Sequence, residues 1–354
     1  MNTNTLSTQT QFPMRWIVSP RYDLFFFMGS CVFTFMFWGV YQVAHHFKLI
    51  MGGNSILITY FFFTAIFDHP HIFQTFSRTH LDGEEFRQRR FLHTWGLVLF
   101  IVVGLLISLA GYENELILFA AIFGSYHIIR QHYGFLKAYK NLHRDTQKYD
   151  NQLDFGVFYL GMIACFFNDY TGQENKGYIT IYGNIKAWFP NLPDFLPELI
   201  WGVFLVVLAL WLARQAWLLV VGEPINLPKM MFLSCALGTH YFIFFATATP
   251  FLVAEALETA YHDIQYQGWM MHYQQKRFPT IKKIALKWFA VSLAYGLIVG
   301  ILEIYGLYYQ NKVLMLLFVP FTMVVIYHYY VDGLVWKFGK NPELRKLIFE
   351  QGGK

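Results

Sequence analysis

The chain has 354 residues, of which 56% are hydrophobic, 20% aromatic and only 14% charged, and its formal net charge is +5. In a soluble domain about a quarter of the residues are charged. Such a domain has no room to bury 38 Phe, 23 Tyr and 10 Trp, whereas lipid-facing helices and interfacial aromatic belts can accommodate them. The composition therefore excludes an ordinary soluble enzyme and predicts an all-α, polytopic membrane helix bundle. The three cysteines lie in apolar runs without CxxC spacing, so we expect neither disulfides nor a zinc knuckle.

Apolar stretches long enough to cross a hydrocarbon core of ~30 Å recur along the whole chain. No small-residue cleavage site follows the first stretch, so we expect it to be retained rather than removed as a signal peptide. Ten spans are predicted, at 23–44, 55–76, 92–110, 116–135, 153–168, 196–213, 230–246, 250–271, 288–308 and 313–336. Residues 169–195 are rich in Gly and Pro and predict an extracytoplasmic loop with an interfacial or re-entrant segment. Residues 1–354 are expected to form a single integral-membrane domain.

Lys and Arg are distributed unevenly between alternate loops, which predicts orientation because positive loops are retained in the cytoplasm. Apart from Arg130 at a helix end, they gather in both terminal segments and in 77–90, 136–152, 214–229 and 273–287. The other loops hold only Lys48, Lys176, Lys186 and Lys312. We therefore expect both termini on the cytoplasmic side of a bacterial-type inner membrane. The positive charge is expected to meet lipid headgroups and not nucleic acid.

Histidines and carboxylates collect toward the cytoplasmic ends of four predicted helices that all run inward. They are Asp68, His69 and His71; His127 and His132; Glu255, Glu258 and His262; and His328 and Asp332. Ionisable groups at such a depth are costly and usually pair, ligate or conduct ions. Independent packing contacts have no reason to share one depth, so the sequence predicts a common site.

Spacing indicates which side chains can share an ion. Glu258 and His262 are four residues apart, as are His328 and Asp332, so each pair lies on one helical face. Histidines and carboxylates contributed by different helices hold non-haem iron and leave positions open for oxygen. For Asp332, a capping or snorkelling role near a helix end is an equal alternative.

The remaining histidine pairs are less regular. His69 and His71 would point apart on a regular helix, but Pro70 disrupts the geometry and could let both turn inward. His127 and His132 are five residues apart, so we expect one of them to ligate and the other to support it.

Several further side chains have two interpretations. His240 lies in the middle of its helix and is equally compatible with a ligand and with a structural contact. Glu255 is either a proton donor or extra ligand, or a buried acid paired with a tyrosine or histidine. Tyr261, next to His262, suits a catalytic or supporting role, with an interfacial tyrosine as the alternative. Arg78 is expected to hold topology, and three histidines beside the basic loops are expected to be solvated, namely His80, His93 and His143.

The run Phe67-Asp68-His69-Pro70-His71, with Asp82 downstream and isolated histidines on later helices, resembles the Pro-His-containing helix of the Brp/Blh family of membrane carotene dioxygenases. The resemblance implies non-haem iron, oxygen and an apolar polyene substrate, with His69 or His71 as a ligand. The chain length and the His-Pro-His order depart from the family's pattern.

These observations predict a metal-dependent membrane oxygenase with one or two iron ions, although Cu, Mn or Zn would also suit the ligands. We expect a lipidic or other apolar substrate that enters from the bilayer, and an electron-donor protein as a further partner. The expected metal ligands are His69, His71, His127, His132, His240, Glu258, His262, His328 and Asp332. Glu255 and Tyr261 are the expected catalytic residues.

Two other classes of protein fit the same residues. A transporter or channel could pass protons or metal ions along the His/Glu cluster, although we detect no inverted repeat of the kind such folds often show. A bis-histidine haem electron carrier would need two facing histidines and would show a Soret band.

Overall fold

The computed structural model describes residues 14–48, 54–171, 178–183, 185–189, 192–193, 195–309 and 312–349. Over these ranges the chain is helical apart from one two-stranded hairpin. Its first half comprises α1 (Pro20–Asp23), η1 (Leu24–Met28), α2 (Ser30–Phe47), α3 (Ser55–Phe63), η3 (Thr64–Asp68), α4 (His69–Thr79), α5 (Gly83–Gln88), η4 (Leu92–Gly96), α6 (Leu97–Leu109), α7 (Glu113–Leu142) and α8 (Lys148–Thr171). Its second half comprises β1 (Tyr178–Tyr182), β2 (Ile185–Trp188), α9 (Phe195–Val221), α10 (Leu227–Tyr241), η5 (Phe242–Ala246), α11 (Phe251–Arg277), α12 (Ile284–Tyr309), α13 (Lys312–Val335) and α14 (Pro342–Phe349). The η segments are π-helical turns.

Seven helices among the described residues are long and apolar enough to cross a membrane. They are Pro20–Phe47, Ser55–Thr79, Leu92–Leu109, Phe195–Val221, Leu227–Ala246, Ile284–Tyr309 and Leu316–Val335. Their outer faces carry large exposed apolar side chains, such as Leu99, Val206 and Ile298, which are 59%, 61% and 63% exposed. So much contiguous apolar surface is typical of a protein embedded in lipid.

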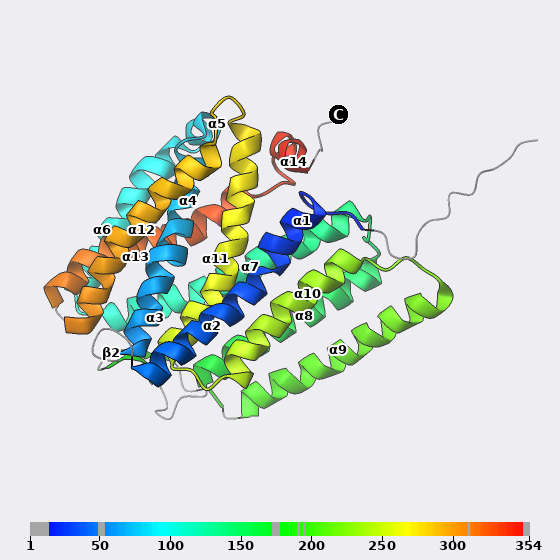
Figure 1. Ribbon diagram of the computed structural model, residues 1–354, viewed down its shortest axis with the longest axis horizontal. Coiled ribbons are helices and arrows are strands. Elements are labelled where there is room, and N and C mark those ends of the chain that lie inside the picture. Colours follow the sequence, from blue (N-terminus) through cyan, green and yellow to red (C-terminus); the bar gives the residue numbers. More distant parts are fainter. Residues whose placement is uncertain are drawn as a thin grey trace, which may run out of the picture.

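Helices also occupy the other three predicted spans, in α7, α8 and α11, but these are too polar to meet the same criterion. Figure 1 shows α7 and α11 in the middle of the molecule, with α6, α12 and α13 on one side and α8, α9 and α10 on the other. Most residues of α11 are buried, so its polar side chains face protein and not lipid. These central helices supply most of the candidate site.

The helix that carries His69 and His71 changes its winding just before them. The π-helical turn η3 ends at Asp68, and α4 begins at His69. Pro70 therefore lies in the first turn of α4, where its missing N–H and fixed φ are tolerated. Both histidines are buried, but the expectation that both turn toward one site is wrong, because His69 pairs with Glu303 of α12 and only His71 lies beside other histidines, His262 and His328.

Two glycines let α12 approach this same segment closely. A Cβ atom at Gly296 would lie 2.5 Å from the carbonyl oxygen of Ala65 and 2.6 Å from the ring of Pro70. A Cβ atom at Gly300 would lie 3.0 Å from Thr64 Oγ1. Gly296 and Gly300 form a GxxxG contact of the kind that joins membrane helices, and it fixes the position of α4.

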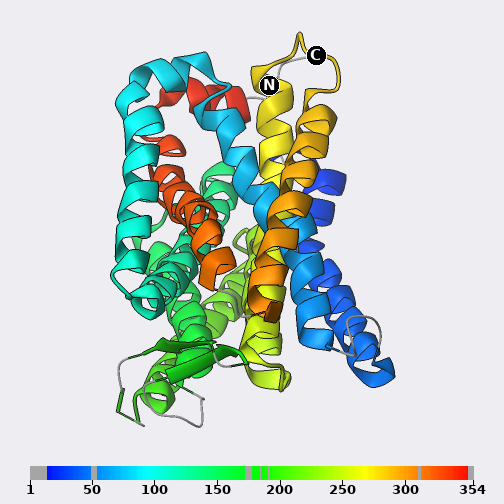
Figure 2. The same cartoon turned by 90° about the vertical axis from the view of Figure 1, so that its left-hand side faces the viewer.

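The described part of the predicted loop 169–195 contains an antiparallel hairpin that pairs Ile179 with Ala187. Strand β1 contacts α11 and β2 contacts α7. Figure 2 shows this hairpin at the opposite end of the bundle from α14. The α8 helix continues to Thr171, and residues 172–177, 184, 190–191 and 194 lie outside the described residues.

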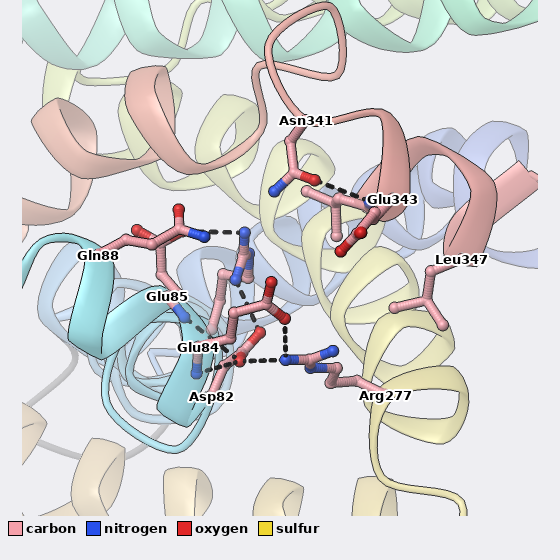
Figure 3. Close-up of a pocket in the computed structure, with 10 residues that line it drawn as sticks. Asp82, Glu84, Glu85, Gln88, Arg277, Asn341, Glu343 and Leu347 are labelled. Atoms are coloured by element: carbon pink, nitrogen blue, oxygen red, sulfur yellow. Dashed lines mark hydrogen bonds and ion pairs between the residues drawn. The ribbon is translucent and has the colours of Figure 1, made fainter.

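A cluster of ion pairs lies at the α5 end of the bundle and includes Arg78, which we expected to hold topology. Arg78 is only 3% exposed and forms ion pairs with Asp82 at 2.8 Å and with Glu85 at 3.1 Å. Arg277 of α11 donates to Asp82 and to Glu84, each at 2.7 Å, and the group lines a pocket beside α14 (Figure 3). Arg78 thus pairs inside the protein because two guanidinium groups and three carboxylates compensate one another.

The expectation that His93 is solvated is wrong, because this residue is only 1% exposed. Its Nε2 lies 3.2 Å from Glu85 Oε1, and its Nδ1 lies 2.8 Å from the Tyr327 hydroxyl. His80 is only part-buried, and its Nε2 lies 2.8 Å from the carbonyl oxygen of His93.

Candidate metal centre

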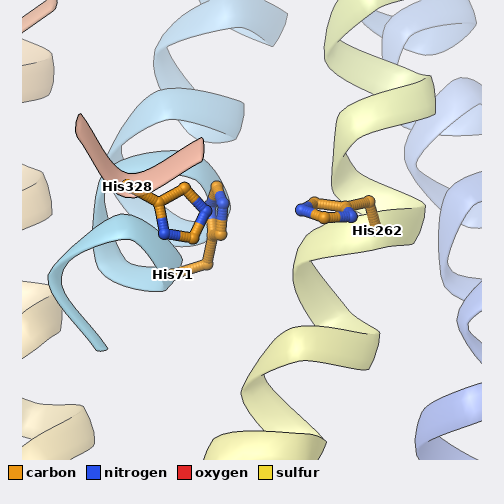
Figure 4. Close-up of side chains that lie close together, drawn as sticks. All are labelled: His71, His262 and His328. Atoms are coloured by element: carbon orange, nitrogen blue, oxygen red, sulfur yellow. The ribbon is translucent and has the colours of Figure 1, made fainter. Parts of the chain in front are cut away.

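Four histidines from four helices meet inside the bundle, and we call them the tetrad: His71 of α4, His127 of α7, His262 of α11 and His328 of α13. Successive ring centroids are 5.2 Å apart from His71 to His262 and 5.0 Å from His262 to His127. The circuit closes with 4.8 Å from His127 to His328 and 4.9 Å from His328 to His71. No ring is more than 6% exposed. In Figure 4, His262 projects from α11 toward His71 and His328.

His71 lies beside two carboxylates. Its Nδ1 lies 2.8 Å from Asp263 Oδ1, and Asp263 is fully buried. A second carboxylate, Asp68, lies 3.6 Å from the same nitrogen. Neither ring nitrogen of His71 has a hydrogen-bond partner among the described residues, so the two carboxylates act on this ring through their charge alone.

A relay of hydroxyl groups orients the ring of His328. Its Nδ1 lies 2.6 Å from Thr75 Oγ1, which in turn lies 2.9 Å from the Tyr266 hydroxyl. Tyr266 donates to Asp332 Oδ1 at 3.0 Å. Because the hydroxyl hydrogen of Tyr266 goes to Asp332, Thr75 donates to Tyr266, and His328 in turn donates Nδ1–H to Thr75. The lone pair of the neutral His328 ring is therefore on Nε2, which is the form of imidazole that binds a metal.

The Nε2 atoms of all four tetrad histidines are buried and have no hydrogen-bond partner among the described residues. An unsatisfied buried polar group costs about 1–3 kcal/mol, so four in one place require a common explanation. His71, His262 and His328 bring one ring nitrogen each within 4.8 Å of one another, and His127, His328 and Asp332 do the same with one ligand atom each. The orphaned nitrogens fit a metal that prefers imidazole, such as Fe, Zn or Cu.

Three more of the predicted residues form a second group beside the tetrad: His132, His240 and Glu258. The rings of His132 and His240 have centroids 5.5 Å apart, and His240 Nε2 lies 3.2 Å from Glu258 Oε1. All three are at most 1% exposed. His262 connects the groups, since its centroid is 5.0 Å from that of His127 and 6.1 Å from that of His132.

The structure does not bring His69 into either group. Its Nε2 lies 3.1 Å from Glu303 Oε2, and Glu303 also accepts a hydrogen bond of 3.0 Å from the Tyr60 hydroxyl. Glu255 is half-buried on α11, about two turns before His262, and belongs to neither group. Tyr261 stacks on His132 with centroids 5.1 Å apart.

Sequence reasoning missed two carboxylates of this region, Asp263 and Glu303. Glu303 had a signal that could have revealed it, because a lone carboxylate inside an apolar span is rarely accidental. Asp263 had none, because its position next to His262 aims it at another face of α11, and only the packing of α4 brings His71 to it.

No protein-family model, no curated protein and no solved structure matches this chain. The class is therefore defined by the fold and the site alone. The chain is an integral membrane helix bundle with buried His/Asp groups that could hold a metal ion.

Proposed function

We propose that this protein is a non-haem iron oxygenase that oxidises a lipidic or other apolar substrate within the membrane. The observation that carries the proposal is the tetrad, whose four buried imidazole Nε2 atoms have no hydrogen-bond partner among the described residues. One ring nitrogen each of His71, His262 and His328 lies within 4.8 Å of the others. When bound there, iron would supply the activation of oxygen.

The surrounding residues would hold the ligands and exclude water. Asp263 lies beside His71, and the relay from Thr75 through Tyr266 to Asp332 orients His328. Such partners fix the tautomer of a ligating histidine and raise its basicity. The same relay can pass a proton between Asp332 Oδ1 and His328 Nδ1.

An apolar substrate suits the surroundings of the tetrad. Tyr329 stacks on His127 with centroids 4.8 Å apart, and Tyr266 lies edge-on to His71. The likeness of the His69-Pro70-His71 run to the Brp/Blh carotene dioxygenases suggests a polyene as the first substrate to test.

We further propose ten membrane spans, including α7, α8 and α11, with both termini cytoplasmic. Contacts support a common end for the basic segments, because the Arg15 backbone N–H donates to His143 Nε2 at 2.9 Å and Arg277 pairs with Asp82. At the same end His272 Nε2 lies 3.1 Å from the carbonyl oxygen of Ile348 in α14. Positive segments gathered at one end favour that end as cytoplasmic.

A proton or metal-ion transporter is the second candidate, and one observation favours it. Ionisable side chains continue from the tetrad toward α12, with 3.6 Å from His71 to Asp68, 3.8 Å from Asp68 to His69 and 3.1 Å from His69 to Glu303. A bis-histidine haem does not fit within the tetrad, since a porphyrin between two imidazoles needs a wider gap than the 4.8–5.2 Å between the centroids of neighbouring tetrad rings.

Oxygen consumption by the purified, iron-loaded protein in detergent tests the proposal, with β-carotene and a long-chain lipid as apolar substrates. We expect uptake that depends on substrate and yields an oxygenated product, and none from His328→Ala. Proteoliposomes that carry protons or divalent cations, with no oxygenated product from any substrate, would instead establish the transporter.

A further inference from the structure

Two carboxylates lie beside Nδ1 of His71 without a hydrogen bond to it. The oxygens Asp263 Oδ1 and Asp68 Oδ1 are 2.8 Å and 3.6 Å from this nitrogen, and the three residues bring one ligand atom each within 4.8 Å of one another. Asp263 is fully buried, and neither of its oxygens has a hydrogen-bond partner among the described residues. In the described part of the chain, all ion pairs of the two aspartates are with histidines. Carboxylates at membrane depth need a stronger positive partner than this.

The position of Asp263 Oδ1 suits a shared metal ion better than a shared proton. A hydrogen bond needs the acceptor close to the axis of the N–H bond, so a contact of 2.8 Å without one places this oxygen to the side of the Nδ1 axis. Ligands that share one ion lie to the side of each other's axis in the same way. At bond lengths of about 2.0–2.2 Å and right or tetrahedral angles, they are roughly 2.8–3.6 Å apart, as Nδ1 is from both aspartate oxygens.

We infer that Asp68, His71 and Asp263 hold a second divalent transition-metal ion, and that the imidazole of His71 bridges it to the ion of the tetrad. The inference rests on the proposed function, because it assumes that the tetrad holds the first ion. His71 can bind both ions because neither of its ring nitrogens has a hydrogen-bond partner among the described residues. Its Nδ1 lies beside the carboxylates, and its Nε2 belongs to the tetrad. Binding of the second ion displaces the one N–H proton of the neutral ring, which is released to solvent.

The ligands indicate which kind of ion this is and what it does. Two carboxylates and one imidazole are harder ligands than the imidazoles of the tetrad, so they favour Mn²⁺, Fe²⁺ or Zn²⁺ over copper. The second ion balances the charge of Asp68 and Asp263. It also holds the ring of His71 in the orientation that the tetrad needs, which no hydrogen bond from the described residues does.

Glu303 of α12 provides a matched control, because it lies beside the other histidine of the His-Pro-His run. Its Oε2 is 3.1 Å from His69 Nε2, a contact that is an ordinary hydrogen bond. Its Oε1 accepts a hydrogen bond of 3.0 Å from the Tyr60 hydroxyl. Both oxygens of Glu303 thus have partners inside the protein, whereas neither oxygen of Asp263 has one among the described residues.

The test is the total metal content per chain of full-length protein that is purified in detergent from metal-replete cells and stripped of loosely bound ions. We expect about two equivalents in the wild type and in Glu303→Gln, and about one in Asp263→Ala and Asp68→Ala. Size-exclusion profiles check folding, and Asp263→Asn, whose neutral amide is a weaker ligand, replaces Asp263→Ala if that variant does not fold. Reconstitution with Mn²⁺ gives a second readout, since two ions that share an imidazole couple magnetically and a single ion does not.

Two results would overturn the second ion and leave the tetrad iron standing. One is a wild type with a single equivalent that Asp263→Ala retains, and the other is full metal content with unchanged magnetic coupling in both Asp263→Ala and Asp68→Ala. A single equivalent that Asp263→Ala loses would overturn the tetrad ion and the bridge. Wild-type protein without any bound metal would overturn the proposed function together with this inference.

Discussion

At the scale of single residues, the site depends on which partner each histidine and carboxylate contacts. The four-residue spacing of Glu258 and His262 predicted one shared ion, but the structure sends Glu258 to His240 and His262 to the tetrad. Four residues turn a helix by about 400°, so the two side chains diverge by roughly 40° and reach neighbouring positions. The sequence predicts that these residues lie close together, but only tertiary packing determines which of them belong to the tetrad and which to the second group.

The relay to His328 leads to a prediction about metal affinity. Thr75→Val keeps the shape of the side chain but removes the hydroxyl that accepts from His328 Nδ1. We expect metal affinity to fall roughly 10–100-fold, as when other supporting partners of metal ligands are lost. Competition with a chelator measures it. Thr59→Val is the control, since Thr59 Oγ1 is buried and has no hydrogen-bond partner in the described part of the chain. An equal affinity in both variants would mean that the relay does not support metal binding.

At the scale of elements, the apolar runs of the sequence predicted the helices well, and helices occupy all ten predicted ranges. The reason is that contact with lipid requires a continuous apolar surface. The same reasoning could not find the hairpin at Ile179 and Ala187 or the π-helical turns, because neither depends on hydropathy. It also could not foresee the close approach of α12 to Pro70, which depends on the absence of a Cβ atom at Gly296.

Gly296 provides a prediction about helix packing. In Gly296→Ala the new methyl group would press on Ala65 and Pro70, which must move together with α4. We expect a loss of about 1–3 kcal/mol in stability, typical of overpacking, and a lower metal content because His71 shifts. Thermal unfolding in detergent and metal analysis measure both effects. Gly202→Ala in α9, where nothing lies within 4 Å of the added Cβ, should leave stability unchanged or slightly higher.

The charge cluster at α5 gives a prediction of pH dependence. Burial alone would raise the pKa of Asp82, but the Tyr273 hydroxyl and the guanidinium groups of Arg277 and Arg78 outweigh it and hold this pKa below its usual value. A lowered folded pKa means that the stabilisation is complete above the ordinary carboxylate pKa of about 4 and is lost as the pH falls through the folded value.

Asp82→Asn should therefore destabilise the protein by roughly 3–5 kcal/mol at pH 7, because it removes the carboxylate that pairs at 2.8 Å with Arg78, which is only 3% exposed. The difference in unfolding midpoint between wild type and variant should shrink as the pH falls below about 4. A difference that stays constant from pH 7 to pH 3 would mean that Asp82 does not titrate with folding.

At the scale of the whole molecule, the proposed orientation follows from charge and can be tested by labelling. In a cysteine-free background, Lys48→Cys should react with a membrane-impermeant maleimide in intact cells. Thr280→Cys and Glu223→Cys, which are exposed at the basic end, should react only after permeabilisation. Labelling of position 280 from outside would invert the topology and place the site in the other leaflet.

The central claim is that this membrane bundle holds iron in the tetrad, and the most direct measurement is the iron content of purified wild type and single-histidine variants. We expect wild-type protein to carry iron and His71→Ala and His328→Ala to lose most of it, because each removes a ligand. His45→Ala and His143→Ala should keep the wild-type content, since His45 hydrogen-bonds to Ser55 and His143 to the Arg15 backbone, both outside the tetrad. Equal iron in all four variants, or iron-free wild type from iron-replete cells, would contradict the claim.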